Sequence, residues 1–155
     1  MAPLNIGTEK ATQKIRHFCA YQERNHKEVK EKLYSFGLYK DEVEEILSAL
    51  IQENYLSEER YAVAFAGGKF RMKQWGKIKI KYELIQHGIS DYCIKKALLA
   101  ISIEDYRATL KKQFEAKLKL LNTEKNSYTK KRKLQTYLIQ KGFEMELINE
   151  LLQEI

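Results

Sequence analysis

Proline, glycine and cysteine are scarce in this 155-residue chain. One proline and seven glycines are too few for a loop-rich all-β fold and indicate long helices joined by short turns. Two cysteines do not make a disulfide framework, and such low usage is typical of a reducing cytoplasm. No apolar run approaches the roughly 18 residues of a membrane span, and residues 1–14 lack the apolar stretch of a secretory signal. We expect a soluble cytoplasmic protein that does not act at a membrane.

Positive charge is concentrated in the middle and C-terminal parts of the chain. The net charge is +7. Residues 1–56 carry −1, whereas residues 57–101 carry +5 and residues 102–155 carry +3. Anionic partners are therefore expected to contact the chain after residue 57.

One sequence unit is written three times, around Gly37, Gly88 and Gly142. These glycines are 51 and 54 residues apart, and aliphatic residues recur four and eight positions before each of them. Aliphatic residues also recur six, ten and thirteen positions after each glycine, which is the spacing of one helical stripe. The pattern predicts a helix that ends at the glycine, followed by a second amphipathic helix.

A further amphipathic segment precedes each helix pair, so every unit is expected to hold three helices. The sequence thus predicts an all-α protein of three tandem three-helix repeats, stacked in an elongated, curved array. The expected limits are 9–56, 57–101 and 102–155, after a mobile N-terminal segment, 1–8. A monomer is the expected oligomeric state.

Two places fit this interpretation poorly. Residues 77–82 alternate lysine with apolar residues, as an edge strand does, but their position in the repeat favours a helix. Gly67 and Gly68 interrupt the first helix of the second repeat, where each glycine costs about 1 kcal/mol relative to alanine.

Several stretches resemble the RecX family, the regulators of the RecA recombinase. They are Tyr21–Val29 with Leu33 and Gly37, then Tyr55–Ala62, then Trp75-Gly76 with Leu84 and Gly88, then Leu138 and Lys141–Phe143. The chain departs from the family pattern at Ser57, where an aspartate is usual, and at Lys77, where a proline commonly follows Trp-Gly.

The resemblance implies a regulator, an inhibitor of RecA, that lodges in the groove of the RecA filament on single-stranded DNA. Family members limit filament growth, ATP turnover and strand exchange, which connects them to DNA recombination, DNA repair and the SOS response. The implied partners are the RecA filament and single-stranded DNA, with double-stranded DNA left open.

Two basic segments are the candidate filament-binding and nucleic-acid-binding sites, because clustered cations neutralise phosphates. The residues are Lys69, Arg71, Lys73, Lys77, Lys79 and Lys81 in the first segment, and Lys130, Lys131, Arg132 and Lys133 in the second. The alternative for both is an ordinary solvated surface. Trp75 lies inside the first segment, and we expect it to pack at a helix junction, whereas stacking on a base is the alternative.

Catalytic patterns are missing from the sequence. The three histidines have no metal-like spacing, and there is no phosphate-binding loop or zinc signature. We expect no enzyme activity, no metal and no cofactor. Two other functions stay open from the residues alone: a DNA-binding protein with helix-turn-helix-like units but no dependence on RecA, and a protein–protein adaptor without nucleic acid.

Overall fold

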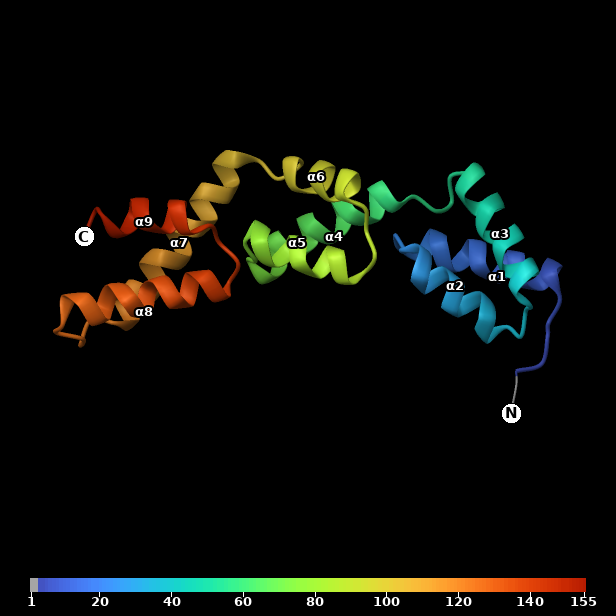
Figure 1. The fold of residues 1–155 in the computed structure, drawn as a ribbon, viewed down its shortest axis with the longest axis horizontal. Coiled ribbons are helices and arrows are strands. Elements are labelled where there is room, and N and C mark those ends of the chain that lie inside the picture. The colour runs from blue at the N-terminus through green and yellow to red at the C-terminus, as the bar shows by residue number, and fades with distance from the viewer. Residues whose placement is uncertain (1–2) are drawn as a thin grey trace.

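The computed structural model describes residues 3–155, and all regular secondary structure in that range is helical (Figure 1). The helices are α1 (Thr8–Tyr21), α2 (His26–Ser35), α3 (Lys40–Gln52), α4 (Glu58–Lys73), α5 (Lys77–Gln86), α6 (Asp91–Leu99), α7 (Ile103–Leu120), α8 (Ser127–Gln140) and α9 (Met145–Leu152). This confirms the predicted all-α class.

The nine described helices form three groups of three, arranged in a row along the long axis of the molecule (Figure 1). Helices that share extensive contacts belong to the same group, as α4 and α6 or α7 and α8 do. The predicted array of three-helix repeats is therefore confirmed. The residue limits given for the repeats stay a prediction; α1 begins at Thr8, and residues 1 and 2 lie outside the described range.

Local signals in the sequence explain where the helices begin and end. Asn25 and Glu28 form a reciprocal capping box at the start of α2, and the Ser57 side chain accepts a hydrogen bond from the Arg60 N–H at the start of α4. Gly37, Gly88 and Gly142 follow α2, α5 and α8 with φ angles of 82°, 76° and 96°. These left-handed conformations are easy for glycine and explain its recurrence at the turns.

The two places that fitted the repeat poorly are both helical. Residues 77–82 lie in α5, with Ile80 and Leu84 fully buried, so the register of the repeat determines their conformation. Gly67 and Gly68 lie within an uninterrupted α4. The guanidinium of Arg71 lies over Gly67, where a Cβ would have to displace it, whereas nothing lies within 4 Å of a Cβ at Gly68.

The hydrophobic core is divided unequally among the repeats. The first repeat has a cluster of its own, centred on fully buried residues such as Ile15, Val29 and Leu33. The second and third repeats share one continuous cluster. Aromatic rings connect them: the buried Tyr106 ring makes tilted contacts with Phe70 (5.8 Å between centroids) and Phe143 (5.4 Å). The second and third repeats therefore form one packed unit.

Backbone contacts lock the second repeat to the third at the Trp75-Gly76 turn. The Gly76 N–H donates to the Lys141 carbonyl (2.7 Å), and the Ile78 N–H donates to the Gly142 carbonyl (3.0 Å). A Cβ on Gly76 would overlap the backbone of Gly142 and Phe143. The glycine after Trp75 thus permits a close approach of two backbones.

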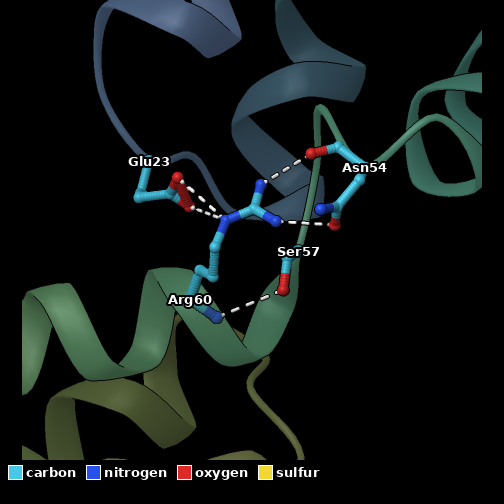
Figure 2. Close-up of polar contacts among 4 residues, drawn as sticks. All are labelled: Glu23, Asn54, Ser57 and Arg60. Atoms are coloured by element: carbon cyan, nitrogen blue, oxygen red, sulfur yellow. Dashed lines mark hydrogen bonds and ion pairs between the residues drawn. The ribbon is translucent and has the colours of Figure 1, made fainter.

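Polar contacts of Arg60 join the first repeat to the second (Figure 2). Its Nε donates to both oxygens of Glu23 (3.1 and 3.0 Å), in the α1–α2 turn. The two terminal nitrogens donate to the side-chain oxygen and the carbonyl of Asn54 (2.7 and 2.9 Å), after α3. One guanidinium from the second repeat therefore binds two turns of the first.

Candidate nucleic-acid interface

Trp75 lies at the joint between the second and third repeats. Its side chain is half-buried and packs against the shared hydrophobic cluster. Two ammonium groups lie near its ring: Nζ of Lys69 at 5.1 Å and Nζ of Lys79 at 4.5 Å from the ring centroid. These distances are typical of cation–π contacts. The expected junction role of Trp75 is confirmed.

Four lysines belong to this joint and are here called the junction cations: Lys69 and Lys79, which contact Trp75, and Lys73 and Lys141, which contact each other. Lys69 and Lys73 are four residues apart on α4 and therefore share one face of that helix. The Nζ of Lys141 donates to the Lys73 carbonyl (3.3 Å), which brings a cation of the third repeat to the second. Within residues 3–155, no carboxylate lies within the 4.0 Å ion-pair distance of any junction cation.

Three cations of the first basic segment are directed elsewhere. Successive helical residues are separated by about 100°, so alternate lysines point to opposite sides. Arg71 lies over Gly67 and lines a small hollow shared with Asp105. Lys77 lies over the Tyr106 ring (4.9 Å), and Lys81 is one turn farther along the same face of α5.

The second basic segment contributes to a stripe along α8. Lys133, Tyr137 and Lys141 follow one another at intervals of four residues, and Lys130 lies on the same side. Beside this stripe is a hollow of about 410 Å³ between α7 and α8. Its lining combines basic side chains with hydroxyls: Lys117, Arg132, Lys133, Thr129, Thr136 and Tyr137. We call it the α8 hollow.

Two residues of the second segment are less available for binding an anion. Lys131 is four residues before Gln135, whose amide contacts Met145 and Asn149, so Lys131 lies on the side of α8 that faces α9. Lys133 forms an ion pair with Glu124 (3.1 Å). The Asn126 backbone N–H and Lys133 hold the pKa of Glu124 below its usual value.

A chain of polar side chains connects the two basic regions. Gln74, next to Trp75, accepts a hydrogen bond from the Gln113 amide on α7. The Tyr137 hydroxyl in turn donates to Gln113 (3.1 Å), and the Lys117 ammonium lies over the Tyr137 ring (4.9 Å). These contacts connect the junction cations to the α8 hollow, and we call the two together the junction surface.

The sequence analysis missed two cations of the junction surface. Lys117 is a single lysine in the mixed charges of α7, and no local pattern distinguishes it. Lys141 precedes the turn glycine of the third repeat, and its spacing of eight from Lys133 on a predicted helix was a usable signal. Its contact with Lys73, 68 residues away, depends on the tertiary fold.

The other reactive side chains are buried or scattered. Cys19 and Cys93 are both buried, and burial raises the pKa of each thiol. Over residues 3–155, no three His, Cys, Asp or Glu side chains are grouped as metal ligands are. No helix in this range has the length and apolar character needed to span a bilayer.

The chain is similar to known proteins along nearly all of its length. The profile of the second three-helix domain of RecX matches residues 57–98, and that of the third three-helix domain matches residues 104–152. Regulatory protein RecX of Clostridium perfringens is 30% identical over 133 residues, 85% of this chain and 62% of that protein. Regulatory protein RecX of Bacillus cytotoxicus is 27% identical over 157 residues, 97% of this chain and 56% of that protein. The chain thus spans about three fifths of the length of these curated relatives.

Solved structures agree with these sequence matches. The crystal structure of RecX from Lactobacillus salivarius superposes with a TM-score of 0.82 at 26% identity and covers 95% of both chains. A second crystal structure of regulatory protein RecX, with a TM-score of 0.83 at 22% identity, supports the fold alone. Two RecX profiles together match more than half of the chain, and a solved RecX matches it almost from end to end. The chain belongs to the RecX family.

Proposed function

We propose that this chain inhibits the RecA recombinase by binding the RecA filament on single-stranded DNA. The proposal rests on membership of the RecX family, whose curated members are named regulatory proteins. It also rests on the elongated shape of the molecule, which offers an extended face for an extended partner (Figure 1). We propose that it acts as a cytoplasmic monomer, without catalysing a reaction, in recombination and repair.

The observation that carries the proposal is the junction surface. Four junction cations, from two repeats, lie around one joint with no carboxylate in ion-pair distance in the described residues. Cations that neutralise phosphates release the counterions of the polyanion, which favours association, and these cations have no ion pair to break first. Backbone hydrogen bonds fix the joint, so the segments that carry these cations keep their relative positions.

ATP turnover by RecA on single-stranded DNA tests the proposed inhibition. Added at substoichiometric to equimolar amounts, the chain is expected to reduce the steady-state rate. Unchanged turnover over that whole range would contradict inhibition of RecA.

A matched pair of variants tests the junction surface. Lys69→Glu with Lys79→Glu is expected to weaken binding to the filament and to lower the salt dependence of binding to single-stranded DNA. Two lost phosphate contacts reduce the slope of log K against log salt by about 1.4. Lys95→Glu with Lys96→Glu makes the same charge change on exposed positions of α6 and is expected to leave both quantities unchanged. Circular dichroism checks that both variants keep their helix content.

The same measurements separate the alternatives. A DNA-binding protein without RecA dependence would bind bare DNA as tightly as the filament and leave ATP turnover unchanged. If the chain were a protein–protein adaptor that does not bind nucleic acid, Lys69→Glu with Lys79→Glu would leave its binding to the partner unchanged. Asp41 and Glu42 in the first turn of α3 place negative charge where a recognition helix would meet phosphates, which disfavours duplex reading by the first repeat.

A further inference from the structure

An open hollow in the first repeat combines aromatic rings with cations. It has a volume of about 580 Å³ and lies between α1 and α2. Lys14, His17, Phe18 and Tyr21 follow one stripe of α1, while Arg24, Lys32 and Phe36 complete the lining from the α1–α2 turn and α2. None of the lining residues is acidic. We call it the first-repeat hollow; it lies outside the junction surface.

The hydrophobic cluster of the first repeat supports two aromatic rings of the first-repeat hollow. Phe18 and Phe36 pack against the hydrophobic cluster of the first repeat. The Phe36 carbonyl also accepts a hydrogen bond from the Ile6 N–H (3.1 Å). Tyr21 stands out at the rim with 78% of its surface exposed. An apolar side chain entering the hollow would therefore meet a preformed aromatic floor.

Cations line the same floor. The Arg24 guanidinium lies 3.7 Å from the Phe18 ring centroid, and its Nε donates to the Phe18 carbonyl (3.1 Å). It also lies 3.9 Å from the Glu28 carboxylate, so Lys14 and Lys32 are the cations that a bound anion would meet. The Lys32 ammonium lies 5.6 Å from Phe18 and 5.8 Å from Phe36, and the Lys14 ammonium lies 5.7 Å from Phe36. Neither lysine has a carboxylate within 4.0 Å among the described residues. An occupant with both an apolar side chain and negative charge fits this lining.

We propose that the first-repeat hollow binds a short acidic peptide segment that carries an apolar side chain. Charge complementarity decides the occupant. The lining is cationic, but the surrounding residues 1–56 carry a net charge of −1, with nine acidic side chains. A long polyanion such as nucleic acid would extend beyond the hollow and gain little from a region whose net charge is close to zero. A short peptide places its carboxylates on Lys14 and Lys32 and its apolar side chain beside the Phe18 and Phe36 rings, within the hollow.

Calorimetric titration of the intact chain with the probe Ac-DEDFDELE-NH2 tests this proposal. The probe is expected to bind, whereas Ac-NQNFNQLQ-NH2, which lacks charge, and Ac-DEDADEAE-NH2, which lacks the large apolar side chains, are each expected to bind at least tenfold more weakly. Equal binding of the three peptides, or no binding of the first, overturns the proposal. The assay contains no RecA, so its outcome is independent of the proposed function.

Variants locate the binding. The double variant Lys14→Glu, Lys32→Glu is expected to bind the probe at least tenfold more weakly than the wild type. The control variant Lys10→Glu, Lys40→Glu makes the same charge change outside the hollow and is expected to alter the affinity less than twofold. Tyr21→Ala, at an exposed rim position, is a second variant that leaves the fold intact and is also expected to weaken the probe. Unchanged affinity in both variants overturns the proposed site.

Competition with a twelve-residue oligo-dT tests nucleic acid as the occupant. If the oligonucleotide displaces the probe and binds the Lys14→Glu, Lys32→Glu variant more weakly, the hollow binds nucleic acid and the peptide proposal is overturned.

Discussion

The Tyr106 hydroxyl donates a hydrogen bond to the Glu144 carboxylate. The same hydroxyl accepts a hydrogen bond from the Lys77 backbone N–H (2.9 Å), and only 2% of the Tyr106 surface is exposed. Burial, followed by the contact with Glu144, raises the pKa of Tyr106, so the phenol stays protonated. One neutral hydroxyl therefore joins the start of α5 to the start of α9, across the joint between the second and third repeats.

Tyr106→Phe is expected to destabilise this joint. The change keeps the buried ring but leaves the Lys77 N–H and the Glu144 carboxylate without their partner, which costs about 1–3 kcal/mol. Urea denaturation followed by circular dichroism measures the free energy of unfolding. Tyr92→Phe removes a hydroxyl from a ring that is 62% exposed and is expected to have almost no effect. Equal stability of the two variants would contradict a structural role for the Tyr106 hydroxyl.

Gly142→Ala is expected to be more destabilising than Gly88→Ala. Both glycines have a positive φ, 96° and 76°, where an alanine costs about 1–2 kcal/mol. A Cβ at Gly142 would also overlap Lys79, whereas nothing lies within 4 Å of a Cβ at Gly88. Relieving that overlap adds about 1–3 kcal/mol and forces the joint apart. Urea denaturation gives the difference, and Trp75 fluorescence is expected to change in the Gly142 variant alone.

Arg60→Ala is expected to loosen the first repeat from the second. Hydrogen bonds from a charged donor contribute about 1.5–3 kcal/mol when shielded from water, and the partial exposure of Arg60 and Glu23 reduces that value here. Arg60→Lys keeps the charge, but its single nitrogen cannot occupy the three donor positions that the guanidinium nitrogens take toward Glu23 and Asn54, so an intermediate effect is expected.

Spin-label distances measure this loosening. Labels at Ser48→Cys on α3 and Lys95→Cys on α6 are exposed, whereas both native cysteines are buried. The distance distribution is expected to broaden from wild type through Arg60→Lys to Arg60→Ala. Identical distributions in all three would show that the contacts in Figure 2 do not hold the repeats.

Lys133→Gln is expected to raise the pKa of Glu124 part of the way to its ordinary value of 4.5. The Asn126 N–H, the larger cause of the depressed pKa, remains in the variant. Since the folded state lowers this pKa, the contribution to stability is complete above pH 4.5 and is lost as the pH falls through the folded value. Side-chain NMR titration of Glu124 measures the shift, and an unchanged midpoint would contradict the contribution of Lys133.

The repeat architecture was predictable because each buried stripe repeats the same spacing. Val29 and Leu33 in the first repeat correspond to Ile80 and Leu84 in the second and to Leu134 and Leu138 in the third, and all are fully buried. This correspondence correctly outweighed the strand-like alternation at residues 77–82. A spacing that occurs three times predicts the fold better than one segment does, because all three segments must bury the same positions in the same kind of helix packing.

The candidate interface was less predictable because it depends on contacts between repeats. Counting charge along residues 69–81 placed Arg71, Lys77 and Lys81 together with Lys69 and Lys79, although helical rotation separates them. The arrival of Lys141 beside Lys73 requires the close approach of Gly76 to Gly142, which no local pattern specifies. The sequence thus predicts which region is basic, but the tertiary fold determines which of its cations lie together at the junction surface.

The unequal division of the core changes how the molecule comes apart. The buried residues of α1 to α3 form one cluster, and those of α4 to α9 form another. Regions with separate cores can open in separate cooperative steps, so we expect amide exchange in residues 3–56 to be less protected than, and largely independent of, exchange in residues 57–155. A chain of three sequence repeats is thus expected to unfold as two units.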